Sequence, residues 1–243
     1  MIEVSNFHKD YRDLTAVDDL TFSVAPGEVL GLVGPNGAGK TTTLRAMSGI
    51  IPPTRGRLSI GGFDIVKAPV EAKRRLAYIP DEPKLFDSLT IWEHLEFAAS
   101  AYEVKNFAER AEALLDAFQL SDKRSTLAQE LSRGMRQKTA VCCAYLHDPT
   151  AILFDEPMVG LDPRGMRTIK DSIRGRADAG SAIIISSHML ALVEDLCTHL
   201  LILHQGKRLF FGSIDEARET YGRLDEEGSI EDVFFRATEG QES

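Results

Sequence analysis

Residues 34–41 place a lysine and a hydroxyl side chain behind a glycine-rich stretch, at a spacing suited to phosphate binding. Glycines let backbone N–H groups turn inward around phosphate oxygens, and a helix that starts there adds positive potential. Lys40 would reach the β- and γ-phosphates of a nucleotide, and the Thr41 hydroxyl would bind Mg²⁺. The sequence therefore predicts a nucleotide-binding segment made of Gly34, Pro35, Asn36, Gly37, Ala38, Gly39, Lys40, Thr41 and Thr42.

Two carboxylates follow an apolar run further along the chain. Residues 151–154 are typical of a buried strand, and Asp155 and Glu156 come directly after it. Adjacent side chains on a strand point to opposite sides, so the two acids are expected to have different roles. Asp155 would orient Mg²⁺ through water, and Glu156 would activate the attacking water as a general base. The alternative is a pair of carboxylates that caps the next helix.

The elements needed to position these residues are indicated by the pattern around them. The apolar run Val29–Val33 predicts a buried parallel strand, and residues 40–50 predict a helix that ends before two prolines. Residues 84–147 have helical periodicity instead, so a helical segment interrupts one α/β core. Further strands are expected at residues 57–60, 151–154, 182–185 and 200–203, and further helices at 164–177 and 189–197.

Composition limits the classes of partner. The chain has 243 residues, 43% of them hydrophobic, and a net charge of -9, which argues against a nucleic-acid partner because phosphate binding needs a clustered basic face. Ten acidic and three basic residues lie between 215 and 243, so we expect a solvated acidic C-terminus. A helix over residues 225–235 would have Ile230, Val233 and Phe234 on one face, for docking on its own core or on a partner.

Cysteine usage and hydropathy predict where the protein works. Cys142, Cys143 and Cys197 are odd in number and form no disulfide framework, which indicates a reducing compartment. The N-terminal residues carry charges where a signal peptide needs its apolar core, so export is not expected. The longest stretch without Asp, Glu, Lys or Arg, residues 179–193, is too short and too polar to span a bilayer. If the protein works at a membrane, another chain crosses it.

Three more motifs complete a set of five. They are Leu-Ser-Arg-Gly-Met-Arg-Gln at 131–137, Gly-Leu-Asp-Pro at 160–163 and Ser-Ser-His at 186–188. In order and spacing, over nearly the whole chain, the set resembles the ATP-binding cassette (ABC) family. The resemblance implies an α/β P-loop NTPase (ABC ATPase) core with an antiparallel β subdomain and an α-helical subdomain inserted at about 84–147. The ATPase domain would cover residues 2–230, followed by an acidic C-terminal tail at 231–243.

The resemblance also implies roles for residues outside the phosphate loop. Two cassettes would pack head to tail, and Ser132 and Gly134 of one would bind the γ-phosphate held by the other. Asp162 would lie at that interface. His188 would contact the γ-phosphate and steady the water near Glu156. In this family an aromatic ring at the position of Tyr11 commonly stacks on adenine.

The chain departs from the family pattern at two positions. Asp81 stands where the family usually has the glutamine of its Q-loop; it could still bind Mg²⁺, although it adds negative charge beside the phosphates. Arg133 stands where the signature usually has its first glycine. Contact of Arg133 with phosphate and exposure of Arg133 to solvent are both open alternatives.

We therefore expect an ATP-binding subunit that uses ATP and Mg²⁺ to drive transport, in the export direction, through separate polytopic membrane subunits. It would be cytoplasmic, at the inner face of the cell membrane, and paired with a second cassette. One alternative is a soluble ABC-type ATPase that moves nucleic acid, which the short insertion between Lys40 and Asp155 argues against. Another is a module that senses ATP without hydrolysing it, which Glu156 and His188 argue against and Asp81 leaves open.

Overall fold

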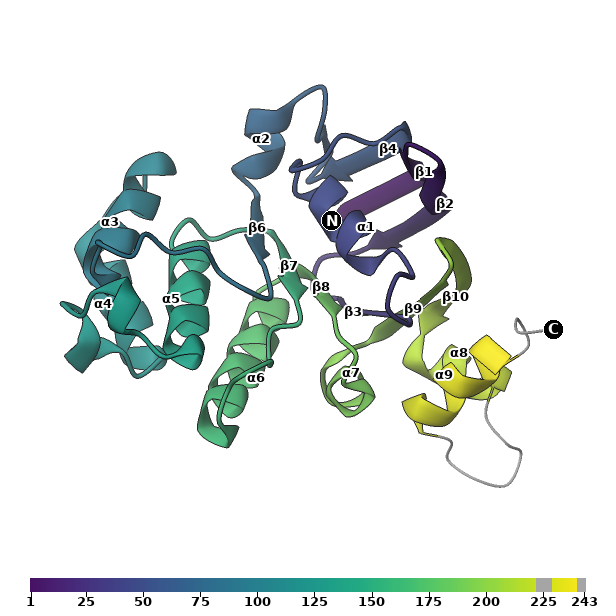
Figure 1. The fold of residues 1–243 in the computed structure, drawn as a ribbon. Coiled ribbons are helices and arrows are strands. Elements are labelled where there is room, and N and C mark those ends of the chain that lie inside the picture. The colour runs from purple at the N-terminus through teal and green to yellow at the C-terminus, as the bar shows by residue number, and fades with distance from the viewer. Residues whose placement is uncertain (222–228, 240–243) are drawn as a thin grey trace.

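Two β-sheets with helices between and around them form the fold of the computed structural model, which describes residues 1–221 and 229–239 (Figure 1). In the larger sheet β10 is antiparallel to β9, and the other neighbours are parallel. The α/β architecture expected from the sequence is therefore confirmed. The strands lie in the order β10 (Lys207–Ser213), β9 (His199–His204), β3 (Val29–Val33), β8 (Ala182–Ser186), β7 (Ala151–Asp155) and β6 (Leu76–Ile79).

The central strands of this sheet are buried on both faces. All residues of β3, β7 and β8 are buried. Alternate residues of β8 enter different cores: Ile183 and Ile185 pack on one side, and Ile184 on the other. Burial on both faces is why these strands appear in the sequence as continuous apolar runs.

The smaller sheet is antiparallel, as the family resemblance implies. Helix α1 (Lys40–Met47) packs between the two sheets, where Leu44 and Met47 are fully buried. The phosphate loop that precedes α1 is therefore held between a strand of the large sheet and a helix enclosed on both sides. The strands of the smaller sheet lie in the order β2 (Leu14–Val24), β1 (Ile2–Tyr11), β4 (Arg55–Ile60) and β5 (Phe63–Asp64), with the short helix α2 (Pro69–Lys73) beside β5.

Helices cover the other face of the large sheet. Ile169 and Ile173 of α6 (Pro163–Asp178) and Leu192 of α7 (Leu190–Leu196) pack in the same core as Ile183. Both helices were expected from the sequence within two residues of these ends.

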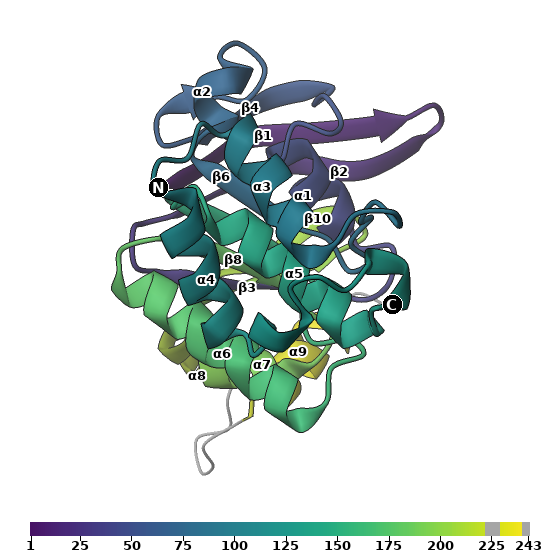
Figure 2. The ribbon, with the colours of Figure 1, turned by 90° about the vertical axis from the view of Figure 1, so that its left-hand side faces the viewer.

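The helical segment stands to one side of the sheets (Figure 1) and faces the viewer in Figure 2. It contains α3 (Ile91–Ala101), α4 (Phe107–Ala117) and α5 (Arg133–Tyr145), with short 3₁₀ turns at Ser121–Lys123 and Ala128–Glu130. Helix α5 contacts β6 and so joins this segment to the large sheet. All three helices lie within the residues 84–147 for which the sequence predicts helices.

The C-terminal region differs from the expected acidic tail. Residues 230–239 form helix α9 (Ile230–Glu239), which packs on α8 (Ile214–Tyr221), α7, β9 and β10. Ile230 and Val233 are fully buried, because the apolar face that the sequence indicates is docked on the chain's own core; Phe234 is half-buried. The expected helix start at 225 lies outside the described residues. Among the described residues no helix is both long and apolar enough to cross a bilayer.

Candidate nucleotide-binding site

The phosphate loop connects β3 to α1 and depends on glycine for its path. Gly39 has a φ of 103°, in the left-handed region, and a Cβ there would lie 2.7 Å from the carbonyl oxygen of Ala16. Gly37 has a φ of 81° but open space around the missing side chain. Glycine is therefore required at 39 for both conformation and space, and at 37 for conformation alone.

Lys40 lies at the centre of this loop. Its Nζ donates hydrogen bonds to the carbonyl oxygens of Gly34 at 2.6 Å and of Pro35 at 3.1 Å. Burial lowers the pKa of the Lys40 ammonium, while the charges of Glu156 and Asp155 oppose that shift. The loop thus holds a cation among backbone carbonyls, at the place where the sequence predicts that β- and γ-phosphates bind.

A cavity of about 680 Å³ extends from this loop to the end of β7. Tyr11 lines this cavity with 42% of its surface exposed, and the Lys9 ammonium lies over one face of its ring, 5.0 Å from the centroid. The structure brings the predicted adenine, phosphate and carboxylate groups together here. The cavity is lined by Tyr11, Leu14, Thr15, Ala16, Asn36, Gly37, Ala38, Gly39, Lys40, Thr41, Thr42, Asp155, Glu156, Ser186 and Gln205.

Five of these lining residues were not among the predicted site residues, although Ser186 begins the Ser-Ser-His motif: Leu14, Thr15, Ala16, Ser186 and Gln205. Long-range packing brings them here. The turn between β9 and β10 approaches β2 so closely that a Cβ at Gly206 would lie 2.9 Å from the Ala16 carbonyl oxygen. Only the Gln-Gly pair of that turn was visible in the sequence, and such a pair indicates a turn rather than a site.

Asp155 and Thr41 supply the oxygen atoms suited to Mg²⁺. Asp155 is buried at the end of β7, and the Tyr78 hydroxyl donates to its Oδ2 at 3.4 Å. Burial raises the pKa of the Asp155 carboxyl, against hydrogen bonds from hydroxyl groups that include Thr41. Burial, and next the Asp155 charge, raise the pKa of Tyr78 to about 12. A carboxylate and a hydroxyl at one cavity wall fit a hard cation that prefers oxygen ligands.

Glu156 follows Asp155 in a left-handed conformation, with φ 50°. Its amide donates to the Ser186 carbonyl at 2.9 Å, and its Oε2 lies 2.9 Å from Nδ1 of His188. A non-glycine residue in this region is strained, and such strain is concentrated at functional sites. The turn directs Glu156 away from the strand toward His188, whose side chain is 65% exposed.

The remaining predicted residues lie outside this cavity. Ser132 and Asp162 are exposed and cap helices: Ser132 accepts from the Met135 amide at 3.2 Å, and Asp162 from the Gly165 amide at 2.8 Å. A Cβ at Gly134 would lie 3.3 Å from Leu161, so the first turn of α5 packs on the loop before α6. Gly34, Pro35, Asp81 and His188 are also not among the lining residues.

Asp81 is placed differently from the expected Mg²⁺ ligand. Its Oδ1 accepts a hydrogen bond at 2.8 Å from Nη2 of Arg133. The two residues at which the chain departs from the family pattern are therefore bonded to each other. The two residues are 52 positions apart in the sequence, so no local pattern connects them.

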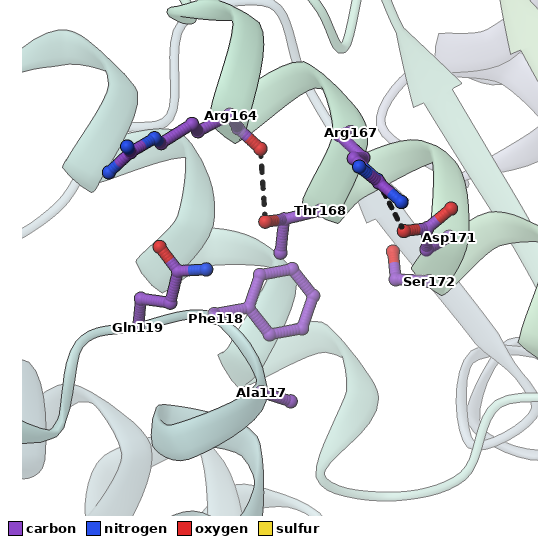
Figure 3. A pocket seen from close by; sticks show the side chains of 8 residues that line it. All are labelled: Ala117, Phe118, Gln119, Arg164, Arg167, Thr168, Asp171 and Ser172. Carbon is purple, nitrogen blue, oxygen red and sulfur yellow. Dashed lines mark hydrogen bonds and ion pairs between the residues drawn. The ribbon is translucent and has the colours of Figure 1, made fainter.

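A second cavity, of about 470 Å³, lies between the end of α4 and α6 and is shown in Figure 3. Two contacts join its lining residues: the Thr168 hydroxyl donates to the Arg164 carbonyl at 3.1 Å, and Arg167 pairs with Asp171 at 3.8 Å. It contains none of the predicted residues. The cavity at the phosphate loop is therefore the stronger candidate site.

Comparison with known proteins agrees with this site. The sequence profile of the ABC transporter family matches residues 17–159. The ABC-type transporter ATP-binding protein EcsA of Bacillus subtilis (strain 168) is 30% identical over 240 residues, which cover 98% of this chain and 96% of that protein. The SkfA peptide export ATP-binding protein SkfE of the same organism is 34% identical over 209 residues, 85% of this chain and 87% of that protein.

A solved structure of an ATP-binding subunit of an ABC transporter is similar along nearly its whole length. It has a TM-score of 0.93 and 34% identity, and the match covers 98% of this chain and 99% of that chain. The match of the family profile includes the phosphate loop and the acidic end of β7. The chain belongs to the ABC transporter family.

Proposed function

We propose that the chain binds ATP with Mg²⁺ and hydrolyses it, as the ATP-binding subunit of a transporter that works with separate polytopic membrane subunits. The observation that carries the proposal is one cavity that joins the phosphate loop to Asp155 and Glu156. A buried carboxylate, a second carboxylate held by a histidine, and a lysine inside a glycine loop are the groups that phosphoryl transfer to water needs.

In this mechanism Lys40 exchanges the carbonyl oxygens of the loop for phosphate oxygens. Mg²⁺ held near Thr41 and Asp155 would neutralise charge on the β- and γ-phosphates. Glu156 accepts the proton of the attacking water. Because His188 contacts Oε2 of Glu156, the other carboxylate oxygen remains available for that water.

Pairing with a second cassette is part of the proposal. Ser132, Gly134 and Asp162 do not line the cavity that holds this chain's nucleotide. Ser132 is a neutral cap exposed at a helix N-terminus, and such an end attracts anions. This supports a role for Ser132 and Gly134 on the nucleotide of a second cassette packed head to tail, either a copy of this chain or a related one. Asp162, a carboxylate exposed at the start of α6, would lie at the same interface.

An apolar groove supports the contact with a membrane subunit. A cavity of about 470 Å³ lies where the end of β6 meets α3 and α5. Phe86 and Phe97 on its wall are 56% and 58% exposed, and their rings pack edge to face. Exposed aromatic clusters of this kind mark interaction sites. We infer that a helix of the membrane subunit docks here, which would place the protein in the cytoplasm at the inner face of the membrane.

Purification from the source cell tests this proposal. Glu156→Gln, expressed with ATP present, should trap the nucleotide-bound complex and recover a stoichiometric polytopic membrane protein from detergent-solubilised membranes. Phe97→Glu should lose that protein and keep ATP binding. Val70→Glu, at an equally exposed apolar position on α2, should keep both. Recovery only from the soluble fraction, with ribosomes, DNA or no partner, would favour the soluble ATPase switch instead.

We also propose a direction of transport, which is export. It is supported by a relative whose name describes peptide export, SkfE. In vesicles that contain the chain and its membrane subunit, substrate should move away from the side of the membrane on which the ATP-binding subunit lies and ATP is supplied. Accumulation in the opposite direction would contradict export and leave ATP-driven transport intact.

A further inference from the structure

Arg133 is the first residue of α5 and lies next to Ser132, which caps that helix. Its guanidinium reaches the loop that follows β6, where Nη2 donates to Oδ1 of Asp81 at 2.8 Å. The pair therefore connects the helical segment to the large sheet at the end where Ser132 is exposed.

The same side chain touches a third segment. A Cβ at Gly160 would lie 2.6 Å from Cδ of Arg133 and 3.0 Å from its Nε, so the arginine lies directly against the Gly160 backbone. Gly160 has a φ of 79°, which a side chain at that position would disfavour. The loop that contains Gly160 begins at Glu156 and ends at Asp162, the cap of α6. Arg133 thus contacts the loop that leads from one catalytic carboxylate to the proposed dimer interface.

The contact joins the two residues that depart from the family pattern, Asp81 and Arg133, and their charges are opposite. An aspartate in place of the usual glutamine adds a negative charge, and an arginine in place of the usual glycine adds a positive one. Both side chains remain nearly half exposed, at 47% for Arg133 and 44% for Asp81. Exposed pairs are weak and screened by salt, so the contact can open and close within a reaction cycle.

We propose that Arg133 and Asp81 are positioning residues: their ion pair, laid across Gly160, fixes Ser132 and the first turn of α5 relative to the loop that starts at Glu156. A change at Glu156 in this chain's own nucleotide site would thereby change the position of Ser132, which acts on the partner cassette's nucleotide. The inference rests on the proposed function. It also assigns Asp81 a partner within the chain in place of Mg²⁺.

A double-mutant cycle tests this inference in the whole chain. Arg133→Gln, Asp81→Asn and the double variant are compared by hydrogen exchange, without nucleotide, at the amides of Met135, Arg136 and Leu161. These amides donate to Ser132 Oγ, the Ser132 carbonyl and the Met158 carbonyl. Each single variant should exchange about two- to fivefold faster at these amides, and the double no faster than the faster single. Arg133→Lys, which keeps the charge, should show a smaller change.

ATP turnover supplies the readout that a merely structural role would not move. Both single variants should lower kcat about two- to fivefold while KM for ATP stays unchanged, because neither residue lines the chain's own cavity. Arg174→Gln is the matched control. Its pair with Asp195 has a similar length, 2.7 Å, and similar exposure, 46% and 41%, but lies on α6 away from the signature.

The outcomes separate this inference from the proposed function. Three results would overturn the positioning role. The effects of the two single variants could multiply in the double variant, or the exchange rate could stay unchanged at all three amides. The third is an effect of Arg174→Gln on turnover equal to that of the two single variants. An unmutated chain that binds ATP without hydrolysing it would contradict the proposed function, and the exchange cycle would still decide whether Asp81 and Arg133 act together.

Discussion

The segment that we propose to hold this chain's own nucleotide and the segment that we propose to face a second cassette are positioned by different physical means. Asp155 and the phosphate loop are fixed by strands that are buried throughout and by glycines that no other residue can replace without strain. Ser132 is fixed by the exposed start of one helix and by the Arg133–Asp81 pair beside it. The first region is preformed, and the second can shift at small energetic cost. An ATP-driven cycle needs both.

The largest expected effect tests the preformed region around the phosphate loop and the carboxylates. Glu156→Gln should reduce ATP turnover by about a hundredfold or more, because the amide accepts no proton from water. ATP binding, measured by calorimetry, should be retained since the side chain keeps its shape. Glu112→Gln, on the exposed face of α4, serves as the control and should turn over normally. Undiminished hydrolysis by Glu156→Gln would remove this residue from the mechanism.

A smaller effect tests the need for glycine in the phosphate loop. Gly39→Ala meets both a left-handed backbone and the Ala16 carbonyl, whereas Gly37→Ala meets only the backbone conformation. Strain of roughly 1–3 kcal/mol at Gly39, in addition to the clash, should weaken ATP binding by about tenfold or more. Gly37→Ala should bind more tightly than Gly39→Ala in the same titration. Equal affinities would mean that the approach of Ala16 does not control the loop.

The region around Ser132, which can shift at small energetic cost, is tested by comparing two helix caps of the same kind. Ser132→Ala and Thr90→Ala each remove a side chain that accepts from the amide three residues later. Each should lower the free energy of unfolding by about 1 kcal/mol in urea denaturation. Only Ser132→Ala should also lower kcat, by about fivefold, the equivalent of one hydrogen bond. If Thr90→Ala slowed turnover equally, the effect would come from helix stability and not from phosphate contact.

The smallest effect concerns the far end of α5, where Asp148 is bound by Arg176 at 2.8 Å and by Arg110. Burial alone would raise the pKa of Asp148, but these two arginines lower it overall. The unfolded chain therefore takes up the proton first as the pH falls, and the stabilisation is present above about pH 4 and lost below it.

Urea unfolding at pH 7 and pH 3 measures this contribution. Asp148→Asn should lose less than about 1 kcal/mol of stability at pH 7, because the carboxylate is largely exposed, and should fall less steeply with acid than the unmutated chain. An equal decline in both proteins would exclude Asp148 as a source of the pH dependence.

The central strands of the large sheet were the part of the fold that the sequence predicted most fully. Strands β3, β7, β8 and β9 were expected because central strands of a parallel sheet are apolar at every position. Strand β10 was not expected: it lies at the sheet edge, begins with two charged residues and is only half-buried where its apolar residues lie. The four-residue strand β6, at the opposite edge, was not expected either.

The site divides in the same way. Residues 34–42 are local in sequence, so their motif was visible. Ser186 begins the Ser-Ser-His motif, but strand pairing is what brings it to the cavity, and Gln205 comes from a distant turn that no local pattern connects with the site. The bond between Asp81 and Arg133 likewise depends on the fold, although the sequence shows each residue as a departure from the family pattern.

The strand order also has a consequence for synthesis on the ribosome. Strand β8 lies between β3, which carries the phosphate loop, and β7, which carries the carboxylates, and it is made after both. A nascent chain that ends before Ala182 has both the phosphate loop and the carboxylates in its sequence but lacks the strand that pairs with both β3 and β7. It leaves both edges of β3 and one edge of β7 unpaired. The phosphate loop and the carboxylates can therefore be joined in one sheet only late in translation, after β8 has been made.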